Sequence, residues 1–350
     1  MVRSRTIIAT PPGATIKEQL DDRKMSQKEL SARMEMSEKH ISRLINGEVQ
    51  LTPDVALRLE SVLGLPASFW CNLESIYREK LLRIKAENEL DEDIEIIKSI
   101  PYKEMVKQGW IEPTRKLADR VFNLRKFFEV VRLGNLNGSF MPRIAARKLG
   151  NSRKSDYALL VSAQKAKIDA RSIQTAPISI ERLKSILPMI RSMTTQDPSV
   201  FYSNLCQELA NCGVALVLLP HIGGSYLHGT TFMDGAKIVI GMTVRGKDAD
   251  RFWFSLFHEI GHIVLGHLVR NTDDESEIEL EADTFAKSTL IPDEAFNELT
   301  ASGSFTRKSI SDFAVRVGID AGIVVGRLQK EGFLNYRDYN DLKTKYEMIA

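Results

Sequence analysis

The sequence predicts a mainly α-helical chain with a small β-sheet, built as an all-α domain followed by an α+β domain. Two observations carry this prediction. The first eighty residues contain only short amphipathic segments separated by capping residues, whereas the apolar run Val214–Leu219 and two runs behind it are typical of strands. An apolar helix with two histidines follows at 252–265. A length of 350 residues is enough for two or three domains.

The composition argues against several classes of protein. A formal net charge of +2 gives no general attraction to nucleic acid or membranes. The basic N-terminus is followed by too short an apolar stretch for a signal peptide. The three cysteines, Cys71, Cys206 and Cys212, form no C-x-x-C pair, which suits a reducing compartment and disfavours a cysteine-ligated zinc site. We therefore expect a cytoplasmic protein with no membrane partner.

Two short helices near the N-terminus are delimited by their capping residues. Ser26 is followed three residues later by Glu29, which together form a capping box. Ser37 can cap a second helix over 38–45, and Asn46-Gly47 can end it. Because only about three residues join the two helices, the pattern predicts a helix-turn-helix, whose second helix enters the major groove of DNA.

The polar side chains of this motif are candidate contacts to double-stranded DNA. They are Gln27, Ser37, Lys39, His40, Ser42 and Arg43. We expect the first two to contact phosphates and the basic ones to reach base edges or phosphates. Residues 1–80 hold 12 Lys/Arg against 11 Asp/Glu, which is a weak electrostatic footprint for a DNA binder. The alternative is a helix-turn-helix used for dimerisation or partner docking.

Residues 12–80 resemble the Xre/Cro repressors and, within them, the HigA-type antitoxin regulators. The resemblance is carried by Ser26-Gln27-Lys28-Glu29-Leu30, Met36-Ser37-Glu38-Lys39-His40-Ile41-Ser42, Thr52-Pro53-Asp54-Val55-Ala56 and Phe69-Trp70-Cys71-Asn72-Leu73. It implies a five-helix DNA-binding domain that acts as a homodimer on a DNA operator. The pattern departs at Glu35, where the turn usually has glycine.

The strongest chemical signal is His258-Glu259-Ile260-Gly261-His262. On a helix the two imidazoles project from one face, one turn apart, and can occupy two corners of a Zn²⁺ tetrahedron. Glu259 beside them can act as the base toward a water molecule whose pKa the metal lowers. The five residues alone also fit a buried helix with two hydrogen-bonded histidines.

A third metal ligand must come from outside this motif. The metzincin pattern fails because Leu265 and Leu268 stand where it needs Gly and His, and His267 would face another side of the same helix. A second helix over 277–286 has an apolar face, and Glu281 neighbours that face. A carboxylate pointing inward is costly unless it is paired or bound to metal. We therefore expect Glu281 as the third ligand; the alternative is a solvated acidic helix face.

The segments before the histidine helix read as strands. Tyr226–Phe232 and Lys237–Gly241 are separated by Asp234-Gly235, which is a hairpin signal. An exposed strand edge there could align an extended peptide across a metal. His228 is a candidate donor to the oxyanion of the reaction, with a structural role as its alternative.

Residues 214–296 resemble the ImmA/IrrE metallopeptidase family, a domain found fused to Xre regulators. The matching stretches are Leu219-Pro220 with Gly223-Gly224, Asp250-Arg251-Phe252-Trp253-Phe254, the histidine motif, Glu281-Ala282-Asp283-Thr284-Phe285-Ala286 and Leu290-Ile291-Pro292. The resemblance implies a zincin-like α+β core that binds Zn²⁺. It implies His258, His262 and Glu281 as ligands and Glu259 as general base.

These observations divide the chain into five parts. We expect a helix-turn-helix domain at 12–80, a helical connector at 81–110, a helical region at 111–212, the metallopeptidase core at 213–305 and C-terminal helices at 306–350. The predicted function is a DNA-binding transcriptional regulator with a zinc endopeptidase that cleaves a regulatory protein, such as a repressor. The alternative is a non-catalytic HigA-like antitoxin, whose metal domain is a sensor or binds a partner such as a toxin.

Overall fold

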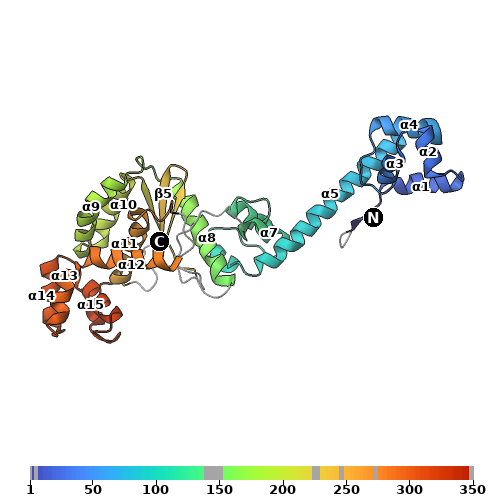
Figure 1. Ribbon diagram of the computed structural model, residues 1–350. Coiled ribbons are helices and arrows are strands. Elements are labelled where there is room, and N and C mark those ends of the chain that lie inside the picture. The colour runs from blue at the N-terminus through green and yellow to red at the C-terminus, as the bar shows by residue number, and fades with distance from the viewer. Residues whose placement is uncertain are drawn as a thin grey trace. The chain divides into compact units, whose positions relative to one another are not determined.

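The computed structural model describes residues 2–3, 7–137, 153–222, 229–243, 248–270 and 275–346. The chain divides into two compact units, Met1–Glu95 and Ile96–Ala350. Figure 1 shows that helices dominate and that the strands gather mainly in the second unit. The predicted fold class is thereby confirmed.

The first unit is helical apart from one short strand pair. Its elements are β1 (Val2–Arg3), β2 (Ile8–Ala9), α1 (Pro12–Asp22), α2 (Gln27–Arg33), α3 (Glu38–Ile45), α4 (Pro53–Leu63) and α5 (Ala67–Ile97). The side chains of Ser26, Ser37 and Thr52 accept hydrogen bonds from the first turns of α2, α3 and α4. The two predicted caps, Ser26 and Ser37, therefore set where α2 and α3 begin, and Thr52 has the same role for α4.

The turn between α2 and α3 keeps its shape although it lacks glycine. Glu35 has a φ of 55°, in the left-handed region that glycine adopts without steric cost. A residue with a Cβ is strained there by roughly 1–2 kcal/mol. The surrounding core, which includes the fully buried Leu30, Ile41 and Trp70, holds the two helices against this strain.

The second unit combines helices with a three-stranded sheet. Its elements are α6 (Tyr102–Lys107), α7 (Leu117–Phe128), η1 (Leu133–Asn137), α8 (Arg153–Ala170), α9 (Ile180–Ser192), η2 (Met193–Thr195), α10 (Pro198–Ala210), β3 (Val214–Leu219), β4 (Gly229–Asp234), β5 (Lys237–Thr243), α11 (Ala249–Val264), α12 (Glu275–Leu290), α13 (Asp293–Ala301), α14 (Arg307–Val317), α15 (Ala321–Lys330) and η3 (Asn340–Leu342).

The sheet has the order β3-β5-β4. Strand β3 runs parallel to β5, and β4 forms the expected antiparallel hairpin with β5, in which Asp234 pairs with Lys237. Gly235 in the turn has a φ of 61°, which a two-residue hairpin loop of this kind requires. Strand β4 thus lies at one edge of the described sheet, next to α11.

Helices cover both faces of the sheet, which explains why β3 is apolar along its whole length. Ala215 and Val217 pack with residues of α8 on one face, whereas Val214 and Leu216 join the larger core formed by helices on the other face. Figure 1 shows α8 on one side of the sheet and α10 and α11 on the other. The sheet therefore provides a fixed support for α11.

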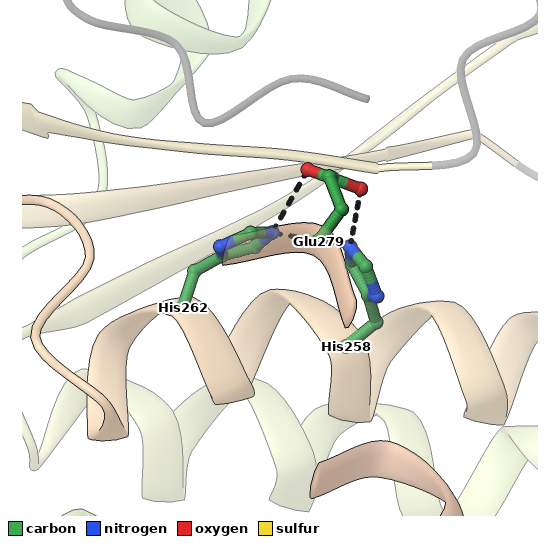
Figure 2. A group of neighbouring side chains, drawn as sticks. All are labelled: His258, His262 and Glu279. Carbon is green, nitrogen blue, oxygen red and sulfur yellow. Dashed lines mark hydrogen bonds and ion pairs between the residues drawn. The ribbon is translucent and has the colours of Figure 1, made fainter. Parts of the chain in front are cut away.

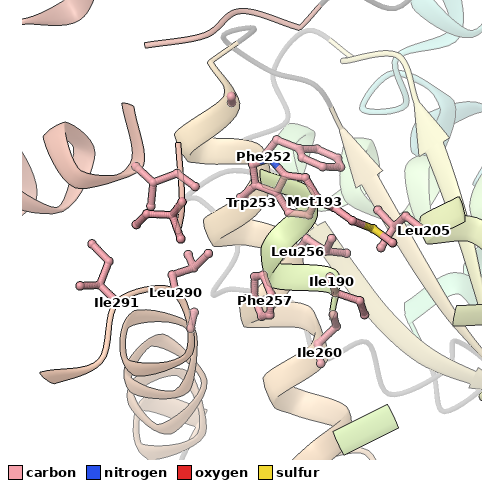
Figure 3. Close-up of a cluster of buried hydrophobic side chains, with 14 of the residues drawn as sticks. Ile190, Met193, Leu205, Phe252, Trp253, Leu256, Phe257, Ile260, Leu290 and Ile291 are labelled. Carbon is pink, nitrogen blue, oxygen red and sulfur yellow. The ribbon is translucent and has the colours of Figure 1, made fainter. Parts of the chain in front are cut away.

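Helix α11 passes through the centre of the larger core. Its apolar side chains Phe252, Trp253, Leu256, Phe257 and Ile260 are at most 5% exposed, and they pack among residues of α9, α10 and the end of α12 (Figure 3). The Trp253 indole donates a hydrogen bond to the Tyr346 hydroxyl at 2.8 Å. No helix in the described part of the chain is both long and apolar enough to cross a bilayer.

Candidate functional site

Helix α11 places His258, Glu259 and His262 in the interior of the second unit. Their exposed fractions are 5%, 4% and 0%. Because residues four apart stand one above the other on a helix, the Nε2 atoms of the two histidines lie 3.1 Å apart. The helix thus aims two imidazole nitrogens at one point.

A carboxylate from α12 completes this group, and it belongs to Glu279. Its Oε2 lies 3.4 Å from Nε2 of His258 and its Oε1 lies 3.5 Å from Nε2 of His262 (Figure 2). One ligand atom from each of the three residues lies within 4.8 Å of the others. The described residues therefore bring together two imidazoles and one carboxylate.

The structure does not bring Glu281 into this group, contrary to the expectation from the sequence. The side chain is on another side of α12, where its Oε2 lies 2.9 Å from His267 Nε2 and 3.0 Å from an Arg270 nitrogen. The stripe of α12 that faces α11 includes Glu279, Ala282 and Asp283, with spacings of three and four residues. A residue two positions from Glu279 cannot share that stripe.

Gly261 allows the two helices to come close enough for this arrangement. A Cβ added at this position would lie 3.0 Å from the Phe285 ring and 3.4 Å from the backbone of Ala282. A larger residue at 261 would press on the Phe285 ring, which must then shift, so glycine favours the close packing of α12 on α11. Gly261 therefore contributes to the geometry of the motif, together with the two histidines.

Asp283 orients His258 from the side opposite to Glu279. Its Oδ1 lies 2.7 Å from Nδ1 of His258. Burial lowers the pKa of His258, but hydrogen bonds to Asp283 and Glu279 and the charge of Glu259 outweigh burial and raise this pKa to about 9. His258 is therefore protonated at neutral pH as long as no cation replaces its proton.

His262 has the opposite protonation state. Burial and the positive charge of His258 lower its pKa to about 4, so its ring is neutral at pH 7. Its Nδ1 lies 2.9 Å from Nδ1 of His267, whose ring is fully buried. His267 does not continue α11: the chain turns at Gly266, which has a φ of 76°, and the turn brings the ring back beside His262.

Hydrogen bonds link His262, His267 and Glu281 in a row, and the groups at the two ends of this row determine where the protons lie. If Nε2 of His262 faces a cation, its proton sits on Nδ1, which then donates to Nδ1 of His267. His267 must then carry its own proton on Nε2 and donate it to Glu281. Arg270 neutralises that carboxylate. Glu281, which the sequence suggests as a ligand, is thus separated from the group of His258, His262 and Glu279 by the rings of His262 and His267.

Glu259 contacts the edge strand β4. The Thr231 hydroxyl donates a hydrogen bond of 2.6 Å to Oε2 of Glu259. A Cβ added at Gly229 would lie 2.5 Å from Oε1 of the same carboxylate, so only glycine fits at that position. The sequence alone singles out neither residue, because their proximity to Glu259 depends on how the sheet packs against α11. His228, the other expected catalytic residue, lies outside the described residues.

The candidate DNA contacts of the first unit differ in exposure. Gln27, Lys39 and Arg43 are exposed, and Arg43 lies 3.5 Å from Glu48. Ser37 is exposed and accepts a hydrogen bond from the His40 amide as the α3 cap. His40 and Ser42 are partly buried. The residues best placed to meet a ligand are therefore the two basic ones on α3 and the glutamine that begins α2.

Comparison with known proteins identifies two matched regions. Residues 16–70 match the helix-turn-helix family and residues 217–329 match the IrrE N-terminal-like domain, a metallopeptidase-like family. The chain is 36% identical over 66 residues to an uncharacterised helix-turn-helix transcriptional regulator of Escherichia coli, which covers 19% of this chain and 70% of the regulator. An addiction-module antidote protein of the HigA family from Coxiella burnetii is 28% identical, with a TM-score of 0.22, and the match covers 24% of this chain and 94% of that protein.

The matched regions agree with the two units of the structure. The helix-turn-helix match spans α2 and α3, and the second match begins within β3 and spans β4, β5, α11 and α12. The chain therefore belongs to the helix-turn-helix transcriptional regulators and carries an IrrE-like, metallopeptidase-like domain in its second half.

Proposed function

We propose that the second unit is a zinc-dependent endopeptidase whose ligands are His258, His262 and Glu279. The convergence of their three ligand atoms within 4.8 Å is the observation that supports this proposal most directly. Two imidazoles and a carboxylate are a known donor set of catalytic zinc sites, in which a fourth position stays open. Asp283 and His267 would orient the rings of His258 and His262 by contacting their Nδ1 atoms, as the hydrogen-bond partners of zinc-bound histidines do.

Glu259 is the candidate general base. Bound zinc would polarise a peptide carbonyl and lower the pKa of a water molecule. Glu259 follows the ligand His258 on α11 but is not itself a ligand, so its carboxylate can take the proton of the water and deliver it to the leaving amine. The hydroxyl of Thr231 would fix the orientation of this carboxylate during both transfers.

The first unit would direct this activity to DNA. We propose that Gln27, Lys39 and Arg43 contact a double-stranded operator and that two copies of the chain bind it together. Membership of the helix-turn-helix regulators supports this assignment. The substrate would be a regulatory protein, such as a repressor or a partner toxin, in the cytoplasm. Free cysteines at three described positions are consistent with that compartment.

A peptide library tests the proposed cleavage without knowledge of the substrate. The zinc-loaded protein is incubated with peptides from a whole-cell digest, and new N-termini are counted by mass spectrometry. Glu259→Gln should keep zinc but reduce cleavage by about 10²- to 10⁴-fold. Glu277→Gln removes an exposed carboxylate from α12 and serves as the matched control, with cleavage unchanged. Equal cleavage by Glu259→Gln and the wild type would refute the role of this residue.

The alternative function is a regulator without peptidase activity, whose metal centre senses a signal or binds a partner. The similarity to a transcriptional regulator favours it, because that similarity concerns DNA binding and not cleavage. The same experiment separates the two functions. A wild-type protein that binds zinc stoichiometrically but cuts no peptide or candidate repressor would select the non-catalytic regulator.

A further inference from the structure

The second unit contains a cavity that the metal centre does not use. It has a volume of about 590 Å³ and lies between the first turns of α11, the end of α12, α15 and the segment after α15. None of the three proposed zinc ligands lines it, and neither does Glu259. Its volume lies within the roughly 300–1,000 Å³ that is typical of small-molecule sites.

Positive charge predominates around this cavity. Three carboxylates line it, namely Asp248, Asp250 and Glu331. Six cationic side chains face them: Arg251, Lys287, Arg327, Lys330, Lys343 and Lys345. A concave surface with low-dielectric walls concentrates the field of such a surplus, so the cavity attracts anions.

The ion pairs show which cations are available to a ligand. Lys343 lies 2.8 Å from Asp250, and both side chains are less than a tenth exposed, so this pair is neutralised inside the protein. Arg327 is paired with Asp293 and Glu331, Lys287 with Glu331, and Arg251 with Asp248. Lys330 and Lys345 are exposed and form no ion pair within the described part of the chain. The surplus charge is therefore concentrated on lysines at the solvent-accessible side.

The remaining wall is apolar. Leu290, Ile291 and Ile323 are between 0% and 4% exposed and line the cavity together with Phe254. Inorganic anions gain nothing from such a wall, whereas an organic anion can bury an acyl or aromatic group against it. The lysines and the apolar wall together favour a ligand that has both an anionic group and an apolar group.

The cavity also contains an unpaired polar atom. Asp250 is 7% exposed, and its Oδ1 has no hydrogen-bond partner among the described residues. A buried acceptor of this kind is costly unless water or a ligand supplies a donor. Water can supply this donor beside a bound carboxylate, which has none of its own.

We propose that this cavity binds a small organic anion with an apolar body, such as a medium-chain carboxylate. The site adjoins the metal centre, because the Phe254 ring in its wall has its centroid 6.4 Å from that of His258. Binding would make the second unit responsive to the concentration of a metabolite of this class. The inference does not rest on the proposed peptidase activity.

Calorimetric titration of the full-length protein tests the site with octanoate as the probe. Octanol has the same apolar body without the charge, and inorganic phosphate has charge without the body. We expect saturable binding of octanoate at one site per chain, much weaker binding of octanol and none of phosphate. Equal binding of octanoate and octanol would overturn the role of the lysines, and no binding of octanoate would overturn the site.

Two variants locate the binding event. Lys330→Glu combined with Lys345→Glu reverses both unpaired charges at the rim and should weaken octanoate binding about tenfold or more. Ser255→Trp should fill the cavity from the half-buried α11 side and abolish binding. Lys308→Glu reverses an exposed charge on α14 away from the cavity and should leave the affinity unchanged. An affinity for octanoate that is identical in all three folded variants would place any binding elsewhere and refute the proposal.

Discussion

Helices α3 and α11 both present polar side chains that are candidates for function, but they do so in opposite ways. Lys39 and Arg43 of α3 extend into solvent, whereas His258 and His262 of α11 are at most 5% exposed. The exposed pair lies on the polar face of an amphipathic helix and makes few contacts. The buried pair is surrounded by partners that determine the position and the proton of each ring.

This difference predicts how the two sites respond to change. Exposed residues can be replaced with little effect on folding, because they leave no unsatisfied partner behind. Buried polar groups are coupled to their neighbours, so a change of pH or of a neighbouring residue alters the site without touching a ligand. The expected effects therefore range from large changes at the metal centre to small ones in the first unit.

The pH should change zinc affinity most strongly. The pKa of His258 is raised to about 9 in the metal-free protein, so zinc must displace a proton at any lower pH. Affinity should therefore rise by about tenfold per pH unit from pH 7 to about 9 and then level off. Competition with a chelator of known pH dependence measures this. An affinity that is constant over that range would contradict a protonated His258.

The same shift affects the stability of the metal-free protein. The pKa of His258 is raised above its ordinary value of 6.5, so its stabilising contribution is complete below pH 6.5 and is lost as the pH rises toward 9. His262 has a lowered pKa of about 4, so its contribution is present above pH 6.5 and is lost as the pH falls through 4. Urea unfolding at several pH values, with Asp283→Asn as the comparison, should show a smaller loss between pH 6.5 and 9 in the variant.

Replacing His267 should weaken zinc binding although His267 is no ligand. His267→Phe keeps a ring of similar size but removes the acceptor for Nδ1 of His262, and the loss of such a partner typically costs about 10- to 100-fold in metal affinity. The absorption spectrum of the cobalt-substituted protein should shift as well, because the His262 ring loses its fixed orientation. His40→Phe, in the first unit, is the control; an unchanged affinity and spectrum in His267→Phe would exclude the role of His267 in positioning His262.

Replacements of exposed residues on α3 should change the affinity for DNA and leave the folding stability almost unchanged. Lys39→Ala and Arg43→Ala should each lower affinity for a selected operator, and the salt slope should fall by about 1 for each phosphate that is no longer neutralised. The free energy of unfolding should change by less than about 0.5 kcal/mol, because both side chains are exposed. Lys308→Ala in the second unit controls for nonspecific charge effects. Unchanged DNA affinity in both variants would favour a docking role for this unit.

The smallest expected effect concerns the turn before α3. Glu35→Gly removes the strain of a left-handed residue but adds freedom to the unfolded chain, so we expect a net stabilisation of about 0.5–1 kcal/mol. Glu38→Gly, in the first turn of α3, should instead destabilise by about 1 kcal/mol. Thermal unfolding of both variants measures the contrast, and destabilisation by Glu35→Gly would show that Glu35 makes an interaction that outweighs its strain.

The sequence predicts well those features that depend on local pattern. Ser26 and Ser37 are caps because cap chemistry acts within three residues, and the hairpin at Asp234-Gly235 follows from the turn itself. The two histidines share a face because helix periodicity places them there. Each of these features can be derived from spacing alone.

Features that depend on packing between distant segments are harder to predict. Glu279 and Glu281 lie in one acidic run, and only the contact between α11 and α12 decides which of them faces the histidines. Thr231 reaches Glu259 across 28 positions of the chain because β4 packs on α11. Helix periodicity misplaces His267, because the helix ends before it, at Val264. The ranges of the five predicted parts remain predictions.

The central claim is that Glu279, and not Glu281, completes the metal centre. The most direct measurement is zinc stoichiometry and affinity for the wild type, Glu279→Ala and Glu281→Ala. We predict one zinc per chain in the wild type, loss of zinc from Glu279→Ala, and retention with at most about 100-fold weaker binding in Glu281→Ala. Retention by Glu279→Ala together with loss from Glu281→Ala would contradict the account, and a wild type that binds no zinc would remove its basis.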